Sequence, residues 1–465
     1  DGVSACCVGL EDELVVVVEA ADHREHLQAT VADRCALPHR SVRVCVVVEL
    51  PRLASGKPDL RAVAEIATQP VIEPEPAPTG DLTALYAEIL NRTDVTPDST
   101  FVSLGGDSLS YVEMSLRLEQ ALGRLPASWH TTTIRELSAA APRPARRRRP
   151  LDTSVALRAV AIVLIVASHI GVFTVRGGAH VLLAVAGFNF ARFHLTDVTR
   201  RTRVRHLLIS VARVAVPSAV FLGALVLVDP DYSWSNALLL NEAIGPRHGD
   251  QRNFWFVETL VYTLLALTAV LALPLLDRWE RRLPFALPMA LLAAALTVRY
   301  DVIALSTDDN LTTPAALFWL FAIGWAAGKA QRTWQRGLVA AVALVSVSGY
   351  FTNSLRTVVV MVGLSALVWL PSLPSTALLN RLAGVLAGSS LYIYLTHWAV
   401  YPLLDDYSGV LALLTSLLVG VLYATAVQRL SALLPRLRRP KTSDRAEVRQ
   451  RTHRIQPQPQ EVRLC

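Results

Sequence analysis

The stretch LRAVAIVLIVASHIGVF, Leu157 to Phe173, decides which class of fold this sequence adopts. It is almost entirely apolar and, with its flanks, long enough to cross a bilayer as a helix. It contains two ionisable residues, Arg158 and His169, which lie ~16 Å apart along the axis at ~1.5 Å per residue. That is about half of the ~30 Å hydrocarbon thickness, so an arginine at one membrane surface places the histidine near the middle. An ionisable group at that depth usually marks a functional site. The alternative is that Arg158 reaches the headgroups and His169 only hydrogen-bonds a neighbouring helix.

The composition indicates an integral membrane protein joined to a soluble part. Of the 465 residues 52% are hydrophobic, and the mean hydropathy is +0.38. Residues 1–141 contain 11 Lys/Arg against 21 Asp/Glu, whereas the remainder holds 34 against 17. The acidic part is therefore followed by a basic part whose positive charges lie beside apolar segments. Membrane topology explains these charges, so membrane lipid is an expected partner and nucleic acid is not.

All five cysteines lie outside the apolar segments: Cys6, Cys7, Cys35, Cys45 and Cys465. Their spacing matches no metal site, so we expect no metal and interpret them as reduced cytosolic thiols. The chain has no signal peptide and begins at Asp1 without a methionine. We therefore expect it to be a fragment of a longer protein.

Residues 1–68 are predicted to form a small α+β subdomain. LVVVVEA (Leu14–Ala20) and SVRVCVVVEL (Ser41–Leu50) are β-branched runs typical of strands. A helix is predicted between them, over His23–Leu37.

The second of these runs leads into PRLASGKPDLRAV, which resembles the closing motif of adenylate-forming ligases. The resemblance implies that Lys57 contacts the carboxylate and phosphate during adenylation. The alternative is a polar loop after an edge strand. The large ATP-binding part of such ligases is missing from this sequence, so we expect the chain to require an upstream ligase core for adenylation.

Residues 69–80, rich in proline and glutamate, are predicted to be a linker, and residues 81–140 have the length of a carrier domain. They contain LGGDSLS, which resembles the attachment motif of phosphopantetheine-dependent carrier domains, in which two glycines leave room around the modified side chain. Ser108 offers an exposed hydroxyl for 4′-phosphopantetheine, and Asp107 keeps a negative charge near a helix N-terminus, where the dipole favours it. Leu109, Val112 and Leu116 are expected on one helical face behind the serine. The motif implies a phosphopantetheinyl transferase as a partner; the alternative is a simple N-cap.

A basic linker, residues 141–150, precedes a membrane domain predicted over residues 151–435, and residues 436–465 are expected to be a basic, disordered cytoplasmic tail. Counting apolar segments of about 17 to 25 residues predicts ten spans. They lie near 154–175, 178–193, 206–228, 253–275, 284–299, 313–329, 337–352, 355–373, 382–402 and 409–434.

The basic residues of the loops orient these spans. If Arg146 to Arg149 stay cytoplasmic, twelve basic residues fall in inside loops: Arg192, Arg200, Arg201, Arg203, Arg205, Arg278, Arg281, Arg282, Lys329, Arg332, Arg336 and Arg381. Five fall outside: Arg176, Arg247, Arg252, Arg299 and Arg356. This asymmetry follows the positive-inside rule and predicts a multi-pass cell-membrane protein with both termini cytoplasmic.

Four motifs in this part resemble the acyltransferase-3 family of integral membrane acyltransferases. An arginine and a histidine separated by ten residues in a first helix beginning LRAVA match its first motif. AVAGFNFAR (Ala184–Arg192) is similar to the family's "SGF" segment, although Ala186 replaces the serine. NFWFVETLVY and SLYIYLTHWAVYPLL are similar to its tryptophan-phenylalanine and "Y-x-x-Y-L-x-H" helices. The resemblance covers roughly residues 150–435.

The resemblance implies transfer of an acyl group from a thioester donor to a hydroxyl on a glycan, lipid or small molecule. His169 is then the general base, since histidine is the commonest base near neutral pH. Arg158 is expected to hold the phosphate or pantetheine end of the donor as a planar, permanently charged group. Glu258 and His397 are further catalytic candidates that orient His169 or the acceptor; the alternatives are an interfacial glutamate and a histidine packed beneath Trp398.

The sequence thus predicts a mainly α protein, an about ten-span membrane helical bundle preceded by a small four-helix carrier domain and a small α+β subdomain. The predicted function is transfer of an acyl or aminoacyl group from a thioester on the chain's own carrier to a hydroxyl-bearing acceptor. One alternative is a transporter or flippase with carrier-delivered substrate. Such proteins often contain an internal repeat, and this sequence shows none. Another is a membrane-anchored fragment of a peptide-synthetase-like ligase.

Overall fold

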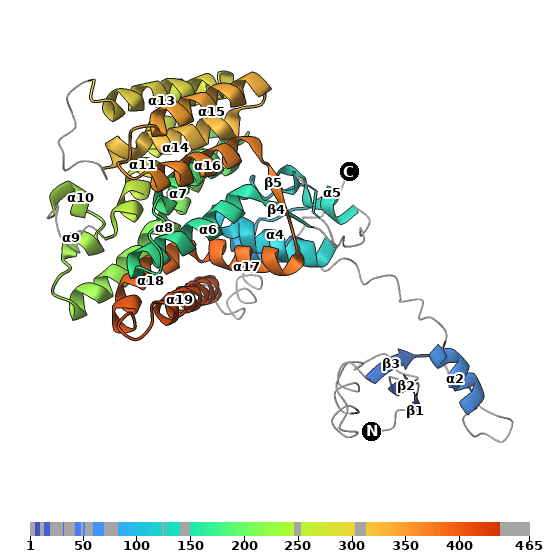
Figure 1. The fold of residues 1–465 in the computed structure, drawn as a ribbon. Coiled ribbons are helices and arrows are strands. Elements are labelled where there is room, and N and C mark those ends of the chain that lie inside the picture. Colours follow the sequence, from blue (N-terminus) through green and yellow to red (C-terminus); the bar gives the residue numbers. More distant parts are fainter. Residues whose placement is uncertain are drawn as a thin grey trace, which may run out of the picture. The chain divides into compact units, whose positions relative to one another are not determined.

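The computed structural model describes residues 5–9, 14–18, 31, 42–47, 50–51, 59–68, 82–122, 125–126, 128–139, 149–245, 253–302 and 313–437. The chain divides into two compact units, Asp1–Pro78 and Thr79–Cys465. Each unit is described by itself (Figure 1).

The first unit contains a small three-stranded sheet and one helix. Strand β2 (Leu14–Val18) pairs antiparallel with β1 (Ala5–Gly9) and parallel with β3 (Val42–Val46). Helix α2 (Leu60–Thr68) contributes Val63 to a buried cluster with Val15 and Val17 of β2. The two expected strands are therefore present, and β1 is an additional one. Most of the helix expected between them, and Lys57, lie outside the described residues.

The second unit begins with the carrier helices. These are α3 (Leu82–Leu90), α4 (Ser108–Leu122), the 3₁₀ turn η2 (Trp129–Thr131) and α5 (Ile134–Ala139). Phe101, Met114 and Leu118 are fully buried at their centre. Ser108 is the first residue of α4, and Asp107 immediately before it accepts hydrogen bonds from the amides of Leu109 and Ser110. The helix start that the LGGDSLS motif predicts is thus present.

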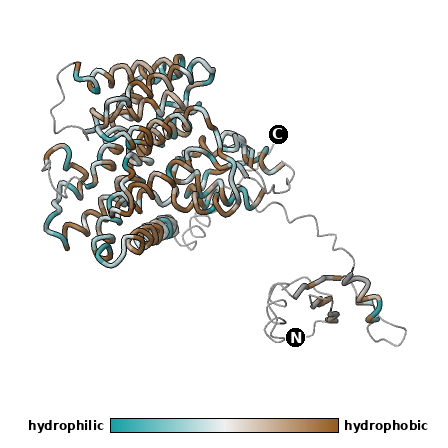
Figure 2. Tube along the Cα trace, viewed as in Figure 1, coloured by the Kyte–Doolittle hydropathy of each residue, from teal (hydrophilic) through white to brown (hydrophobic). Residues whose placement is uncertain are grey.

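The membrane domain follows as a helical bundle. In chain order its helices are α6 (Thr153–Ile170), α7 (Gly178–Phe193), α8 (Arg200–Val228), α9 (Trp234–Ala237), α10 (Asn241–Ile244), α11 (Trp255–Ala272), α12 (Pro274–Arg282), α13 (Ala286–Arg299), α14 (Pro314–Lys329), α15 (Thr333–Val347), α16 (Ser354–Trp369), α17 (Ala377–Gly388), α18 (Ser390–Val400), the turn η4 (Tyr401–Leu403) and α19 (Gly409–Leu437). The fold is mainly α, as predicted. Figure 2 shows how densely hydrophobic residues line these helices.

A short two-stranded sheet joins distant parts of this domain. Strand β4 (Arg149–Asp152), at the end of the basic linker, pairs antiparallel with β5 (Ser372–Ser375) between α16 and α17. Helices α7 and α14 pack with backbones in direct contact, since a Cβ on Gly187 or Gly324 would collide with the carbonyl of Phe321 or Ala184. Gly187 belongs to the AVAGFNFAR segment singled out in the sequence.

The ten apolar segments each contain helix, but they are not ten uniform spans. In the described part of the chain, α6, α8, α11 and α19 are long and apolar enough to cross a membrane. Two bent pairs raise this number to six: α12 with α13 at 112°, and α17 with α18 and η4 at 70°. The single helix expected over 382–402 is therefore broken near Ser389. The span expected over 154–175 ends at Ile170, where Gly171 adopts the left-handed conformation (φ 83°).

Candidate active site and carrier docking surface

The carrier helix α4 packs directly against the membrane domain. Val112 and Leu116 contact α17, where a Cβ added to Gly384 would come within 2.9 Å of Leu116 Cδ1 and 3.4 Å of Val112 Cγ1. One buried cluster joins the carrier residue Val112 to Val155, Ala383 and Ala387 of the membrane domain. The face of Leu109, Val112 and Leu116, expected to lie behind the serine within the carrier, is therefore its docking face.

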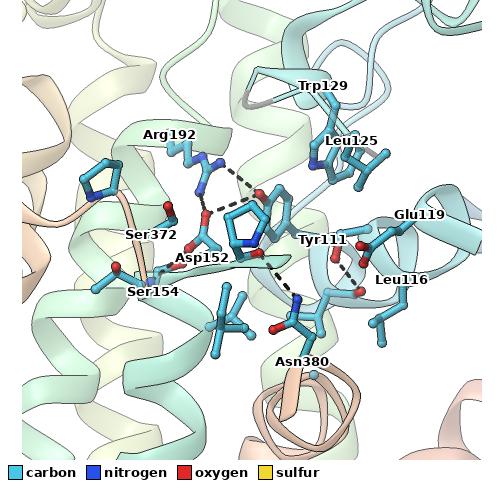
Figure 3. A pocket seen from close by; sticks show the side chains of 18 of the residues that line it. Tyr111, Leu116, Glu119, Leu125, Trp129, Asp152, Ser154, Arg192, Ser372 and Asn380 are labelled. Atoms are coloured by element: carbon cyan, nitrogen blue, oxygen red, sulfur yellow. Dashed lines mark hydrogen bonds and ion pairs between the residues drawn. The ribbon is translucent and has the colours of Figure 1, made fainter. Parts of the chain in front are cut away.

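Ionic and aromatic contacts support this docking next to the basic linker (Figure 3). Arg192 of α7 donates hydrogen bonds to Asp152 Oδ2 at 2.7 Å and to the Tyr111 hydroxyl of α4 at 2.9 Å. Tyr111 also stacks on Trp129, with ring centroids 5.0 Å apart. Burial alone would raise the pKa of Asp152, but Arg192 and Ser154 lower it, so the carboxylate stays charged. A cavity of about 510 Å³ opens beside these residues, between α4 and the membrane domain.

A second ion pair holds the attachment motif itself. Asp107 is buried (2% exposed) and lies 2.8 Å from Arg213 Nη1 of α8. Burial opposes its ionisation, but Arg213 and the Ser110 amide lower the pKa of Asp107 to about 2. Gly105 has φ +80°, and a Cβ there would approach His206 Cδ2 of α8 to 2.8 Å. The glycine is thus needed both for its backbone conformation and for this contact.

Arg158 joins the attachment serine to the interior of the bundle. It is buried (7% exposed), and its Nη1 donates to the carbonyl oxygen of Ser108 at 2.6 Å. Its Nη2 donates to Ser390 Oγ at the start of α18, at 3.2 Å. The break between α17 and α18 therefore supplies a hydroxyl partner for the guanidinium.

A cavity of about 80 Å³ begins at this point and extends between the helices. Ser108 and Arg158 line it at one end. Asn189 of α7, Phe256 of α11 and Tyr394 of α18 also line it. The ring of Tyr394 in turn lies 5.7 Å from that of His397. The cavity thus has the attachment serine and Tyr394, a neighbour of His397, in its lining.

His169 and His397 form a hydrogen-bonded pair. His169 Nδ1 lies 2.9 Å from His397 Nε2, the rings are nearly parallel, and Trp398 covers His169 with centroids 4.5 Å apart. His397 is fully buried, whereas His169 is exposed in the last turn of α6. The histidine expected midway along its span therefore lies at the end of a shorter helix.

The partners of His397 assign the tautomers of both rings. Its Nδ1 lies 2.7 Å from the carbonyl oxygen of Tyr394 and 3.2 Å from that of Ile393, so this nitrogen carries the proton. In the neutral pair, His397 Nε2 then accepts and His169 Nδ1 donates. His169 Nε2 is left with a lone pair, and none of the described residues hydrogen-bonds to it. This arrangement resembles a base that a second group orients.

Glu258 is placed differently from the other candidates. Its carboxylate accepts hydrogen bonds from the backbone amides of Asn241 at 3.1 Å and Glu242 at 2.8 Å, at the start of α10. Within the described residues no hydrogen bond joins Glu258 to either histidine. The structure thus joins Ser108, which follows Asp107, to Arg158 near the start of α6, and pairs His169 with His397 at its end. In the part of the chain that the structure describes, Glu258 bonds to neither group, and Lys57 lies outside that part.

Several residues of the site and of the docking surface were not singled out from the sequence. Arg213 is a charged residue within an expected span, which is a usable signal, but it was left out of the count of loop charges. Asn189 and Ser390 lie inside quoted motif segments that do not mark them individually, and Asp152 lies in none. The hydroxyl of Tyr394 donates a hydrogen bond to the Asn253 carbonyl oxygen at 2.7 Å, a partner that the sequence does not indicate. Only the folded contacts connect these residues to Ser108.

An extended phosphopantetheine arm is about as long as the separation of Arg158 and His169. Its roughly fourteen bonds from serine oxygen to sulfur equal those of nearly five extended residues, or about 16 Å. Arg158, which contacts Ser108, and His169 are ~16 Å apart along α6. The lining also suits the group, with a guanidinium near the phosphate end and mostly apolar residues beyond.

Comparison with known proteins agrees with this geometry. Residues 155–428 match the Acyl_transf_3 family, described as "Acyltransferase domain", and residues 80–141 match "Phosphopantetheine attachment site". Over 122 residues, 24% of the chain, it is 34% identical to "Nonribosomal peptide synthetase ataP" of Aspergillus terreus. The chain spans only 8% of that relative, whose name fits the interpretation of residues 1–68 as part of a ligase. No solved structure matches the chain. Because the acyltransferase match covers more than half of its length, the chain belongs to the acyltransferase-3 family of membrane acyltransferases and carries a phosphopantetheine carrier domain.

Proposed function

We propose that this chain transfers an acyl or aminoacyl group from a thioester on its own carrier domain to the hydroxyl of an acceptor. The observation that supports the proposal is a series of contacts: Ser108 bonds Arg158, both line a cavity with Tyr394, and Tyr394 neighbours the histidine pair. A carrier that served only as a tether would not need its attachment serine in the lining of such a cavity.

Ser108 is the proposed attachment site of 4′-phosphopantetheine, through a phosphopantetheinyl transferase. When bound, this group supplies a mobile arm and a reactive thioester. Arg158 holds the entrance, with one guanidinium nitrogen on the serine carbonyl and the other on Ser390. Asp107 and Arg213 fix the start of α4 against α8, so that the serine faces the cavity. Loading from a free acid requires a ligase core, and Lys57 is proposed to belong to that ligase site.

His169 is the proposed general base. Its Nε2 takes the proton from the acceptor hydroxyl as the oxygen attacks the acyl carbon, and returns it to the leaving group. His397 is a positioning residue, since its Nε2 accepts from His169 Nδ1 and its own Nδ1 is held by two backbone carbonyls. His397 therefore fixes the ring of His169 and stabilises the proton on it. Glu258, tied to the α10 amides, is proposed to shape the acceptor end rather than to move a proton.

The topology proposed with this function places both termini and the carrier in the cytoplasm. It is supported by twelve inside against five outside basic residues in the expected loops. The histidine pair then lies toward the opposite side from the carrier, so that the acceptor approaches from there.

The test follows the acyl group on the carrier. A phosphopantetheinyl transferase and acetyl-coenzyme A load the full chain in lipid nanodiscs without a ligase, and intact mass spectrometry follows loss of the acetyl group on adding an alcohol. Wild type should load and discharge. Ser108→Ala should not load, and His169→Ala should load but discharge ~10²–10⁴-fold more slowly. Discharge of His169→Ala at the wild-type rate would contradict the role of this histidine.

A further inference from the structure

Three arginines meet at the end of the membrane domain remote from the carrier. Arg176 lies in the loop between α6 and α7, Arg299 is the last residue of α13, and Arg356 lies in the first turn of α16. Figure 1 shows the carrier helix α4 at one end of the bundle and α9 and α10 at the other. We call the three arginines and the neighbouring His180 of α7 the arginine cluster. All three arginines belong to the five that the loop count puts outside, against the usual bias.

Packing brings these residues together. A Cβ on Gly177 would lie 3.5 Å from the carbonyl oxygen of Arg356, which places the Arg176 loop against α16. Arg356 Nη2 is 3.2 Å from His180 Nε2. The guanidinium of Arg356 lies 4.3 Å from the centroid of Phe351, and that of Arg299 lies 4.4 Å from Tyr350.

Among the described residues, no carboxylate balances the positive charge of the cluster. In the part of the chain that the structure describes, no carboxylate forms an ion pair with any of the three arginines. The buried Nε atoms of Arg299 and Arg356 have no hydrogen-bond partner there. Ring stacking offsets part of the cost of burying a guanidinium and does not use its in-plane N–H groups, of which those on Arg356 Nη2 face His180. Such edges bind the oxygens of phosphate or carboxylate groups, frequently in pairs.

The cluster also adjoins the catalytic histidine. Arg176 is close enough to act electrostatically on both His169 and Arg356, and its loop directly follows the last turn of α6, which holds His169. His180 is buried against Trp255, with ring centroids 6.0 Å apart, and Phe351, at 4.9 Å. An oxyanion bound here would hold the rest of its molecule beside the lone pair of His169 Nε2.

We propose that the arginine cluster binds an oxyanion on the acceptor, so that the acceptor is an alcohol that also carries a phosphate or carboxylate group. This inference rests on the proposed function, because it takes His169 as the base that the acceptor hydroxyl meets. The oxyanion belongs either to a soluble molecule or to a lipid headgroup, and the experiment separates the two.

The first measurement is binding and needs no loaded carrier. Ser108→Ala protein in phosphatidylcholine nanodiscs is titrated with glycerol 3-phosphate and with glycerol by calorimetry. In parallel, native mass spectrometry measures retention of phosphatidylglycerol relative to phosphatidylcholine. In at least one of the two measurements, we expect the anionic ligand to bind more tightly than the uncharged or zwitterionic one. Arg176→Gln should weaken binding of that anionic ligand about tenfold or more. Arg176 is an exposed loop residue, so this change is compatible with folding; exposed Arg282→Gln on α12 is the matched control.

Preference for glycerol 3-phosphate identifies a soluble acceptor, and preference for phosphatidylglycerol alone identifies a lipid one. Arg356→Lys, which keeps charge but loses the planar edge, should also weaken binding. Absence of anion preference in both arms, or equal binding by Arg176→Gln and Arg282→Gln, overturns the inference.

Transfer then separates this inference from the proposed function. With acetyl-loaded wild type, the anionic alcohol should discharge the carrier faster than glycerol, and Arg176→Gln should lose that advantage while retaining discharge by glycerol. Failure to discharge with any alcohol would count against the proposed function. Equal discharge by neutral and anionic alcohols would count against the arginine cluster alone.

Discussion

The two ends of the membrane domain use arginine in different ways. At the end that contacts the carrier, Arg192, Arg203 and Arg213 each have a carboxylate oxygen within 2.7–2.9 Å. At the remote end, Arg176 and Arg356 have no such partner among the described residues. A buried guanidinium paired with a carboxylate joins parts of the protein, whereas an unpaired one is available to a ligand. The comparison predicts structural losses at the first end and binding losses at the second.

The largest structural effect is expected at Arg203, which is 2% exposed and bonds Asp277 at 2.9 Å and Glu280 at 2.8 Å. Arg203→Ala leaves two buried carboxylates with less compensation and should destabilise the domain by about 3–5 kcal/mol. Thermal unfolding in nanodiscs measures the loss. Arg205→Ala, an exposed neighbour on the same helix, is the control. Equal stability of the two variants would mean that the buried network is not structural.

A smaller effect is expected at the docking contact. Arg192→Ala removes charged hydrogen bonds to Asp152 and Tyr111 and should weaken docking by about 2 kcal/mol, or roughly 30-fold. Maleimide labelling of Val112→Cys, buried while α4 is docked, reports undocking in a background without native cysteines. The labelling rate should rise by about the same factor. An unchanged rate would show that Arg192 does not hold the carrier.

Acid should weaken docking further through Asp107. Burial alone would raise the pKa of Asp107, but Arg213 and the Ser110 amide lower it to about 2. The stabilisation that the Asp107 carboxylate gives to docking is therefore fully present above its ordinary pKa near 4 and is lost as the pH falls from 4 toward 2. The Arg213 contact accounts for at most about 2 kcal/mol of this. Energy transfer between dyes on Arg117→Cys and Arg381→Cys measures the docked fraction.

The same titration with Asp107→Asn separates the contribution of this carboxylate to the acid response from that of the nearby His194 and His206. The variant should be less docked near neutral pH and should change less between pH 4 and 2. An identical acid response in both proteins would assign the effect to other groups.

The smallest structural effect is expected at the remote end. Arg176→Gln removes an exposed loop charge with no carboxylate partner among the described residues, so unfolding stability should change by less than about 0.5 kcal/mol. The same thermal measurement as for Arg203→Ala checks it. A loss comparable to that of Arg203→Ala would remove the contrast between the two ends.

The sequence predicts most of the architecture because its signals are local. Apolar runs mark the helices, and LGGDSLS marks the start of α4 at Ser108. The break between α17 and α18 was missed because both halves are apolar, and their continuity hides the 70° bend. The early end of α6 depends on Gly171, one glycine in an otherwise favourable run.

The site itself was predicted as residue types rather than as an arrangement. Arg158, His169, Ser108 and His397 were selected from the sequence by residue type and motif, and their roles remain proposals. That His397 is hydrogen-bonded to His169 follows from a contact between residues 228 positions apart. The tautomers follow from backbone carbonyls one turn away on α18. No local pattern encodes either fact.

The central claim is that the carrier transfers its acyl group from the docked position, and a crosslink tests it most directly. Val112→Cys and Gly384→Cys, in a background without native cysteines, place two thiols where Val112 Cγ1 already lies 3.4 Å from a Cβ at 384. The carrier is loaded with an acetyl group under reducing conditions, oxidised to lock it, and then given acceptor. The account predicts that the locked carrier discharges its acetyl group at close to the rate of the unlocked one. A locked carrier that keeps its acetyl group, while the reduced form discharges it, would contradict the account.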